Sequence, residues 1–184
     1  RPVRTIAITV KDGESDAVLP NTRLTLFGSG GTKTPYATDS NGQAAVVLAD
    51  AGLGQEEPVL EASHSSYRTA RVSLRAEAVT ILMYRGTSGK RPVTPSLTQP
   101  THRVYRASEK IPVEVSVTNP DAVPLDTVGL MIGDHFVQAL TVKGDKAVGS
   151  ISGLKAGEHQ MKVRAWASAP LHDVYDSAAV KIQV

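Results

Sequence analysis

The chain has 184 residues, a formal net charge of +2 and no cysteine, so it offers neither the basic field of a nucleic-acid binder nor disulfides, thiolate metal ligands or a cysteine nucleophile. Hydrophobic residues make up 41 % of the chain and charged residues 21 %, which is too apolar for a disordered protein and suits one large or two small globular domains. No apolar run approaches the roughly 18 residues of a membrane-spanning helix, so we expect no membrane insertion.

The first half of the sequence alternates short apolar runs with turn signals. Residues 4–10 place Ile6, Ile8 and Val10 on one face of a strand, because side chains alternate between the two faces of a strand. Residues 38–42 read Thr-Asp-Ser-Asn-Gly, which predicts a tight turn, since glycine accepts positive φ and short polar side chains bond the nearby backbone. Further strands are expected at residues 22–27, 36–38, 43–48, 59–63, 70–74 and 79–84. This spacing, without a helical period, predicts an antiparallel β-sandwich.

A segment rich in glycine and proline divides the sequence. This segment contains two glycines, Gly86 and Gly89, followed by three prolines, Pro92, Pro95 and Pro100. Glycine loosens a chain and proline stiffens it, so this composition is typical of a linker. We therefore expect a first domain at residues 1–86, a linker at residues 87–92 and a second domain at residues 93–184.

The second half repeats the strand pattern. Residues 111–117 alternate apolar and polar side chains, and residues 127–132 and 135–142 flank Gly133-Asp134, which predicts a hairpin with a two-residue turn. Further strands are expected at residues 146–151, 158–167 and 177–184. The sequence thus predicts an all-β protein built from two tandem antiparallel sandwiches.

The first half resembles a known family through the order of its turns and strands. Lys11-Asp12-Gly13, Leu19-Pro20-Asn21-Thr22, Leu24-Thr25-Leu26, the turn at 38–42 and then Tyr67 are similar to the carboxypeptidase regulatory-like domain. The resemblance covers about residues 3–85. It implies a transthyretin-like sandwich, of a kind found on many secreted and cell-surface bacterial proteins.

The second half resembles bacterial immunoglobulin-like domains over about residues 93–184. The resemblance rests on the corner at residues 151–159, where Gly153 and Gly157 let the chain double back, and on the alternating Met161, Val163 and Ala165 that follow. It implies an Ig-like sandwich. Both families typically supply spacers, adhesin modules or accessory domains. The resemblance therefore implies that the role of these domains depends on the protein to which they are attached.

No constellation of residues predicts an enzyme. The five histidines are single and scattered, with no metal-ligand spacing between neighbours. Asp39 and Asn41 resemble half of a calcium loop, but residues 43–48 supply no further carboxylate, so a side-chain-stabilised turn is the favoured interpretation. The segment at 86–90 looks like a phosphate loop, yet Pro92 forbids the helix that such a loop needs. We expect no catalytic residue, no metal and no cofactor.

Trp166 is the candidate binding residue. Because Met161, Val163 and Ala165 occupy one face of their strand, Lys162, Arg164 and Trp166 are expected on the other, pointing away from the core. A tryptophan beside two cations suits a sugar ring or a protein contact. The alternative is that the ring lies against Arg164, or under the loop at 170–175. Sugar grooves normally use several rings, and aromatic residues are only 4 % of this chain.

These observations favour a non-enzymatic structural or adhesion segment of a bacterial surface, secreted or periplasmic protein, which acts as a spacer and a protein-interaction module. Its expected partners are other domains of a larger chain or other surface proteins, without nucleic acid. Two alternatives stay open. One is an accessory carbohydrate-binding domain pair of a secreted hydrolase, with a glycan at Trp166. The other is a subunit of a secretion, pilus or phage-tail assembly.

Overall fold

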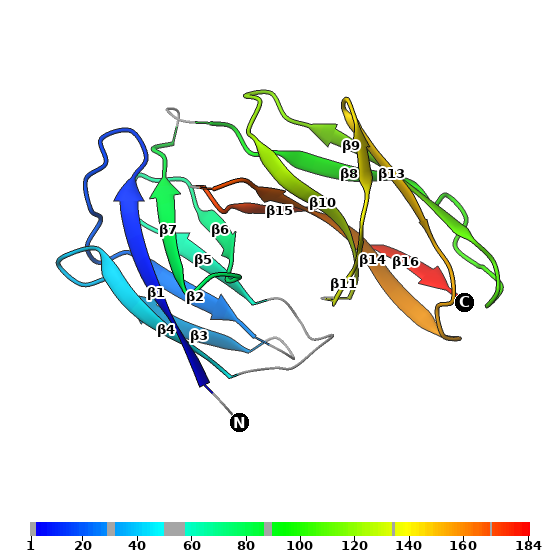
Figure 1. Ribbon diagram of the computed structural model, residues 1–184, viewed down its shortest axis with the longest axis horizontal. Coiled ribbons are helices and arrows are strands. Elements are labelled where there is room, and N and C mark those ends of the chain that lie inside the picture. The colour runs from blue at the N-terminus through cyan, green and yellow to red at the C-terminus, as the bar shows by residue number, and fades with distance from the viewer. Residues whose placement is uncertain (1–2, 29–31, 50–57, 87–89, 134, 170) are drawn as a thin grey trace. The chain divides into compact units, whose positions relative to one another are not determined.

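The chain folds into β-strands throughout the part that the structure, a computed structural model, describes: residues 3–28, 32–49, 58–86, 90–133, 135–169 and 171–184. Those residues contain no helix (Figure 1), which confirms the predicted all-β class. The chain divides into two compact units, one formed by Arg1–Lys90 with Ala167–Val174 and the other by Arg91–Trp166 with Tyr175–Val184. The domain bounds expected at 1–86 and 93–184 stay a prediction, and residues 87–89 of the expected linker lie outside the described residues.

The first unit consists of two sheets. Its strands are β1 (Val3–Asp12), β2 (Arg23–Phe27), β3 (Lys33–Ala37), β4 (Gln43–Ala49), β5 (Val59–Ser63), β6 (Ala70–Ser73) and β7 (Ala78–Met83). One sheet has the order β4-β1-β7 and the other β3-β2-β5-β6. Strand β1 is the centre of the first sheet, antiparallel to β4 and parallel to β7.

The core of the first unit lies between these sheets and is aliphatic. Ile6, Ile8 and Val10 of β1 are at most 1 % exposed, as the alternation of residues 4–10 predicts. They pack in one cluster with apolar side chains from the remaining strands, among them Leu24 and Leu60. Burial of this many aliphatic side chains provides the main stabilising contribution, about 1.5–3 kcal/mol for each fully buried residue.

The turn at residues 38–42 brings the chain from one sheet of the first unit to the other. Asp39 Oδ1 accepts hydrogen bonds from the backbone N–H groups of Asn41 and Gln43, both at 2.9 Å. Gly42 has a φ of +69°, and a Cβ there would lie 2.8 Å from the carbonyl oxygen of Val10. The sequence prediction of a side-chain-stabilised turn is confirmed.

A polar cluster around Asp12 joins the end of β1 to Tyr67 and to Arg85, which follows β7. The Tyr67 hydroxyl donates to Asp12 Oδ2 at 2.5 Å, and the backbone N–H groups of Glu14 and Ser15 donate to Oδ1 at 2.8 and 3.0 Å. The Arg85 Nε lies 3.7 Å from the same carboxylate, and its guanidinium is 5.3 Å from the Tyr67 ring centroid. The hydrogen bond from Tyr67, then those from the backbone, lower the pKa of Asp12 from 3.8 to about 2.

The second unit also consists of two sheets. Its strands are β8 (Thr94–Gln99), β9 (Ile111–Thr118), β10 (Leu125–Ile132), β11 (His135–Ala139), β12 (Thr141–Lys143), β13 (Lys146–Ile151), β14 (Glu158–Ala167), β15 (Val174–Asp176) and β16 (Val180–Gln183). One sheet has the order β12-β13-β9-β8, and the other runs β11-β10-β14-β15 with β16 also paired to β14. The core of this unit lies between the two sheets. It includes five side chains that are each at most 2 % exposed: Val113, Val115, Leu130, Met161 and Val163.

Two strands of the second unit differ from the sequence prediction. Residues 94–99 form β8 although Pro95 lies within them; β8 is the outermost strand of its sheet, where the missing N–H of proline is tolerated. The single strand expected at 135–142 is divided into β11 and β12, which belong to different sheets. Leu140 between them is 7 % exposed. The predicted turn residue Gly133 has a φ of +61°, and Asp134 lies outside the described residues.

The Asp12 cluster predicts how acid destabilises the first unit. Because the folded pKa of about 2 lies below the ordinary 3.8, the folded state binds fewer protons than the unfolded state between these values. The stabilisation is therefore complete above the ordinary pKa and is lost as the pH falls toward 2. We expect the melting temperature of the wild type to fall more steeply over this range than that of Tyr67→Phe, which lacks the donor. Parallel slopes in thermal melts recorded by circular dichroism would contradict this.

Candidate functional site

The predicted candidate residues lie on β14 of the second unit. Met161, Val163 and Ala165 are fully buried on one face of this strand, which confirms the predicted alternation. Lys162, Arg164 and Trp166 occupy the intervening positions and therefore the opposite face. The structure thus brings the three candidates into one row along β14.

The expectation that Arg164 and Trp166 point into solvent is wrong. Each is only 3 % exposed, and Lys162 is half-buried. From Val163 to Ala167 both faces of β14 are buried. The alternation therefore identifies the face correctly but not its exposure, because residues distant in the sequence cover it.

Asp176 on the neighbouring β15 forms ion pairs with both cations of the row. Arg164 donates from Nε to Asp176 Oδ1 at 2.7 Å and from Nη2 to Oδ2 at 3.1 Å, and the Lys162 Nζ lies 3.4 Å from Oδ2. The Arg164 side chain is 4 % exposed and that of Asp176 is 15 % exposed. A buried bidentate ion pair of this kind fixes both side chains. In this arrangement the charges of Lys162 and Arg164 therefore hold β14 to β15.

Trp166 packs against an aromatic residue from the edge strand. The rings of Phe136 on β11 and Trp166 meet edge to face, with centroids 5.7 Å apart, a favoured geometry for aromatic pairs. Gly129 on β10 makes this possible, because a Cβ there would lie 2.5 Å from the Phe136 ring and 2.8 Å from the Trp166 ring. The Arg164 guanidinium carbon is 6.0 Å from the Trp166 ring centroid, as the alternative interpretation expected. Phe136 is 46 % exposed and was not identified from the sequence.

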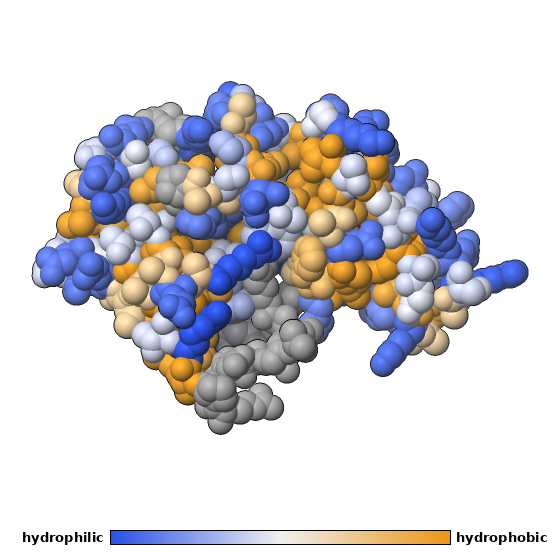
Figure 2. Space-filling view, in the orientation of Figure 1, coloured by the Kyte–Doolittle hydropathy of each residue, from blue (hydrophilic) through white to orange (hydrophobic). Residues whose placement is uncertain are grey.

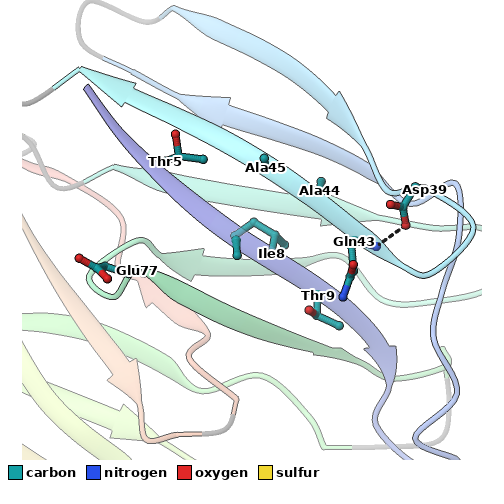
Figure 3. A pocket seen from close by; sticks show the side chains of 9 residues that line it. Thr5, Ile8, Thr9, Asp39, Gln43, Ala44, Ala45 and Glu77 are labelled. Carbon is teal, nitrogen blue, oxygen red and sulfur yellow. Dashed lines mark hydrogen bonds between the residues drawn. The ribbon is translucent and has the colours of Figure 1, made fainter. Parts of the chain in front are cut away.

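A shallow depression lies on the outer face of the first unit's three-stranded sheet. It has a volume of about 500 Å³ and crosses β1 and β4 (Figure 3). Its floor is low because Ala7 pairs with Ala45 on one side and Ala78 on the other. Tan and near-white residues lie over β1 and β4 in Figure 2. The sequence gives no sign of this surface, since alanines on an outer face carry no chemical signal.

The depression lacks the residues of a catalytic or metal site. Glu77 and Asp39 lie toward its two ends, and Thr5, Thr9 and Gln43 are its other polar residues. The Asp39 carboxylate accepts the N–H groups of its own turn. Within the described residues there is no group of three or more His, Cys, Asp or Glu able to hold a metal ion. The described lining therefore consists of small apolar side chains with a few hydroxyl, amide and carboxylate groups.

Comparisons with known proteins give distant similarities only. No family model matches the chain, and no curated protein matches it. The fibronectin(III)-like modules of Clostridium thermocellum CbhA are similar to 49 % of this chain over 93 % of their own, with 20 % identity and a TM-score of 0.40. BcpA, the major pilin subunit of Bacillus cereus, matches 99 % of this chain over 69 % of its own, with 10 % identity and a TM-score of 0.34. A 1.5-MDa bacterial ice-binding adhesin matches 100 % over 64 %, with 14 % identity and a TM-score of 0.35.

The fold of this chain is established by its own strand pairing rather than by these similarities. The named resemblance of the first half to the carboxypeptidase regulatory-like domain stays a prediction. The binding role of Lys162, Arg164 and Trp166 also stays a prediction.

In the described part of the chain, no helix has the length and apolar character needed to cross a membrane.

The burial of Trp166 predicts a large effect of its removal. Trp166→Ala should lower the free energy of unfolding by about 3–5 kcal/mol, as for other buried aromatic side chains, because Phe136 and Arg164 would lose their contacts with the ring. Chemical denaturation of the two proteins measures the difference. As the only tryptophan in the chain, it also reports unfolding by its own fluorescence. A loss below about 1 kcal/mol would show that the ring is exposed, as the sequence analysis expected.

Proposed function

We propose that this chain is a structural or adhesion segment of a bacterial surface, secreted or periplasmic protein, in which it serves as a spacer and a protein-interaction module rather than as an enzyme. The all-β architecture supports this role, as does the lack of a metal cluster among the described residues. A spacer must keep its length when it is pulled. The spacer role therefore depends on how each unit joins an early segment to a late one, and in both units these segments pair in parallel.

The first unit pairs its first strand with its last strand in parallel. The register of β1 and β7 runs from Ala7 opposite Ala78 to Asp12 opposite Met83. Two hydrogen bonds extend the ladder beyond that register, from the Ala7 N–H to the Glu77 oxygen at 2.9 Å and from the Gly13 N–H to the Met83 oxygen at 2.8 Å. The segment Arg1–Lys90 of this unit thus runs into one end of a hydrogen-bonded strand pair and out of the other.

This arrangement resists force because of its direction. Tension applied before β1 and after β7 pulls these two strands past each other along the strand axis. Ladder hydrogen bonds run between the strands, so such a pull loads all of them at the same time. In an antiparallel hairpin pulled from one end, each bond opens before the next is loaded. The β1–β7 pair therefore acts as a clamp in a chain under tension.

The second unit repeats the arrangement on a smaller scale. Val104 forms a parallel bridge with Gln183, near the C-terminal end of the chain. The Gln183 N–H donates to the Arg103 oxygen and the Gln183 oxygen accepts from the Tyr105 N–H, both at 2.8 Å. Both units therefore join an early and a late segment in parallel, and the longer ladder of the first unit should resist the larger force. Glycan binding at Trp166 has no comparable observation in its favour, because the ring is buried.

Single-molecule pulling in two directions tests the load-bearing role. Because the chain has no cysteine, cysteine pairs can serve as the only attachment points. Val3→Cys with Gly86→Cys pulls β1 and β7 along each other. Val3→Cys with Val47→Cys peels β4 from β1, since Val3 and Val47 lie at the same end of that antiparallel pair. Val3 and Val47 are exposed, and a Cβ at Gly86 meets no atom within 4 Å.

We predict that pulling through positions 3 and 86 requires a higher unfolding force than pulling through positions 3 and 47 at equal loading rate. Both variants should keep the wild-type melting temperature, which serves as the control for folding. Equal forces in the two directions would contradict a clamp between β1 and β7, and with it the spacer role.

A further inference from the structure

The two sheets of the first unit differ in width, and one strand of the wider sheet is left uncovered. The sheet β4-β1-β7 has three strands, whereas β3-β2-β5-β6 has four. Thr34 and Tyr36 of β3 pair with Leu26 and Leu24 of β2 and therefore share the core-facing side of the sheet. Leu24 and Leu26 are at most 8 % exposed, but every residue of β3 is exposed or only half-buried. Among the strands that the structure describes, none thus lies over the core-facing side of β3.

The strand that borders this uncovered side, β4, has a free edge. The Val10 N–H donates to the Gly42 oxygen, so in this antiparallel pair residues 44, 46 and 48 bond to β1 and residues 43, 45 and 47 direct their backbone groups away from it. Asp39 bonds both backbone groups of Gln43. Ala45 is the next such residue, and no strand among the described residues pairs with this edge of β4.

Tyr36 stands in for part of the missing strand. Its ring packs against the buried cluster of the first unit, and its hydroxyl accepts a hydrogen bond from the Val47 N–H at 3.3 Å. That donor is one of those directed to the free edge. A side chain from β3 therefore satisfies one backbone group of β4 that a further strand would otherwise satisfy.

The free edge of β4 also lacks the features that usually prevent strand addition. Lysine, proline and bulges protect exposed strand edges in many proteins. Strand β3 carries Lys33 and Pro35, but β4 has neither a charged residue nor a proline, and its register with β1 is uninterrupted. Val47 beside the edge is 48 % exposed.

We propose that the free edge of β4 accepts a single extended strand from a partner protein, which completes the narrow sheet of the first unit. The incoming strand pairs with the backbone of Ala45 and Val47 and places apolar side chains, at every second position, over Thr34 and Tyr36 of β3. Strand addition to a sheet edge is an established mode of protein recognition. The inference rests on the proposed function as a protein-interaction module and names the surface and the partner.

The geometry favours a single strand over a second copy of the chain. Neighbouring strands lie about 4.8 Å apart, so the one uncovered strand of the wider sheet leaves room for one strand opposite it. Antiparallel pairing of two β4 edges about a two-fold axis would place the β3 strands of both copies on the same side, in the same space. Dimerisation through this edge is therefore disfavoured.

A labelled synthetic peptide with the sequence of residues 3–12 is a suitable probe. This sequence already forms an antiparallel ladder with β4 as part of the chain and carries Ile6, Ile8 and Val10 on one face. The control peptide contains Ile8→Pro, which interrupts pairing. Fluorescence anisotropy with the full chain measures binding. We expect binding of the first peptide below about 1 mM and none of the control.

Three variants locate the binding. Tyr36→Phe releases the Val47 N–H and should bind about 2- to 10-fold more tightly, the range of one neutral hydrogen bond. Thr34→Glu places a charge under the docked strand and should bind at least about tenfold more weakly. Ala37→Glu adds the same charge to β3 at an exposed position on its opposite face and should bind as the wild type does. Melting temperatures verify that each variant is folded.

Each other outcome overturns the proposal. No binding to the wild type or to Tyr36→Phe would show that the edge is closed. Equal binding to Thr34→Glu would place the peptide elsewhere, for example in exchange for β1. Dimerisation of Tyr36→Phe in sedimentation experiments would identify a second copy as the occupant. The pulling experiment uses no peptide, so it distinguishes failure of this inference from failure of the spacer role.

Discussion

The double pairing of β1 is the constraint on which the first unit depends. Among the described strands of its sheet, β1 alone has two neighbours, β4 on one edge and β7 on the other. Its inward side chains Ile6, Ile8 and Val10 lie in the centre of the core. Loss of β1 would therefore remove both the hydrogen bonds of the narrow sheet and the middle of the buried cluster. The Asp12 cluster fixes the end of β1 to Tyr67 and Arg85.

The same strand gives the two edges of its sheet different roles. On the β7 side, parallel pairing joins the beginning and the end of the unit and suits it to bear load. On the β4 side, the sheet stops one strand short of the sheet opposite, and Tyr36 covers only part of the remaining edge. A module that holds its length through one edge and recruits a partner through the other combines the two roles that we propose.

Local patterns predict the strands well where one face is buried, because alternation of apolar residues reports that face directly. The inward rows of β1 and β14 were predicted on this basis. The turn at Asp39 was predicted from its glycine and its short polar side chains. The exposure of the second face depends on residues far away in the sequence: Trp166 is buried in part by Phe136, and Arg164 is paired with Asp176. Strand β8 was missed because Pro95 is typical of a linker, and only its place at a sheet edge makes it tolerable. The depression over Ala7 and Ala45 arises from the register of three strands, which sequence reasoning does not provide.

Hydrogen exchange at Ala7 and Ala45, followed by nuclear magnetic resonance, tests the central role of β1 most directly. These two alanines face each other across β1 and β4 and both have exposed side chains, so they form a matched pair. The Ala7 amide bonds to Glu77 on the β7 side, and the Ala45 amide faces the free edge. After correction for intrinsic rates, we predict that Ala7 exchanges only through global unfolding and that Ala45 exchanges rapidly. Equal protection of the two amides, or faster exchange at Ala7, would contradict the central role of β1.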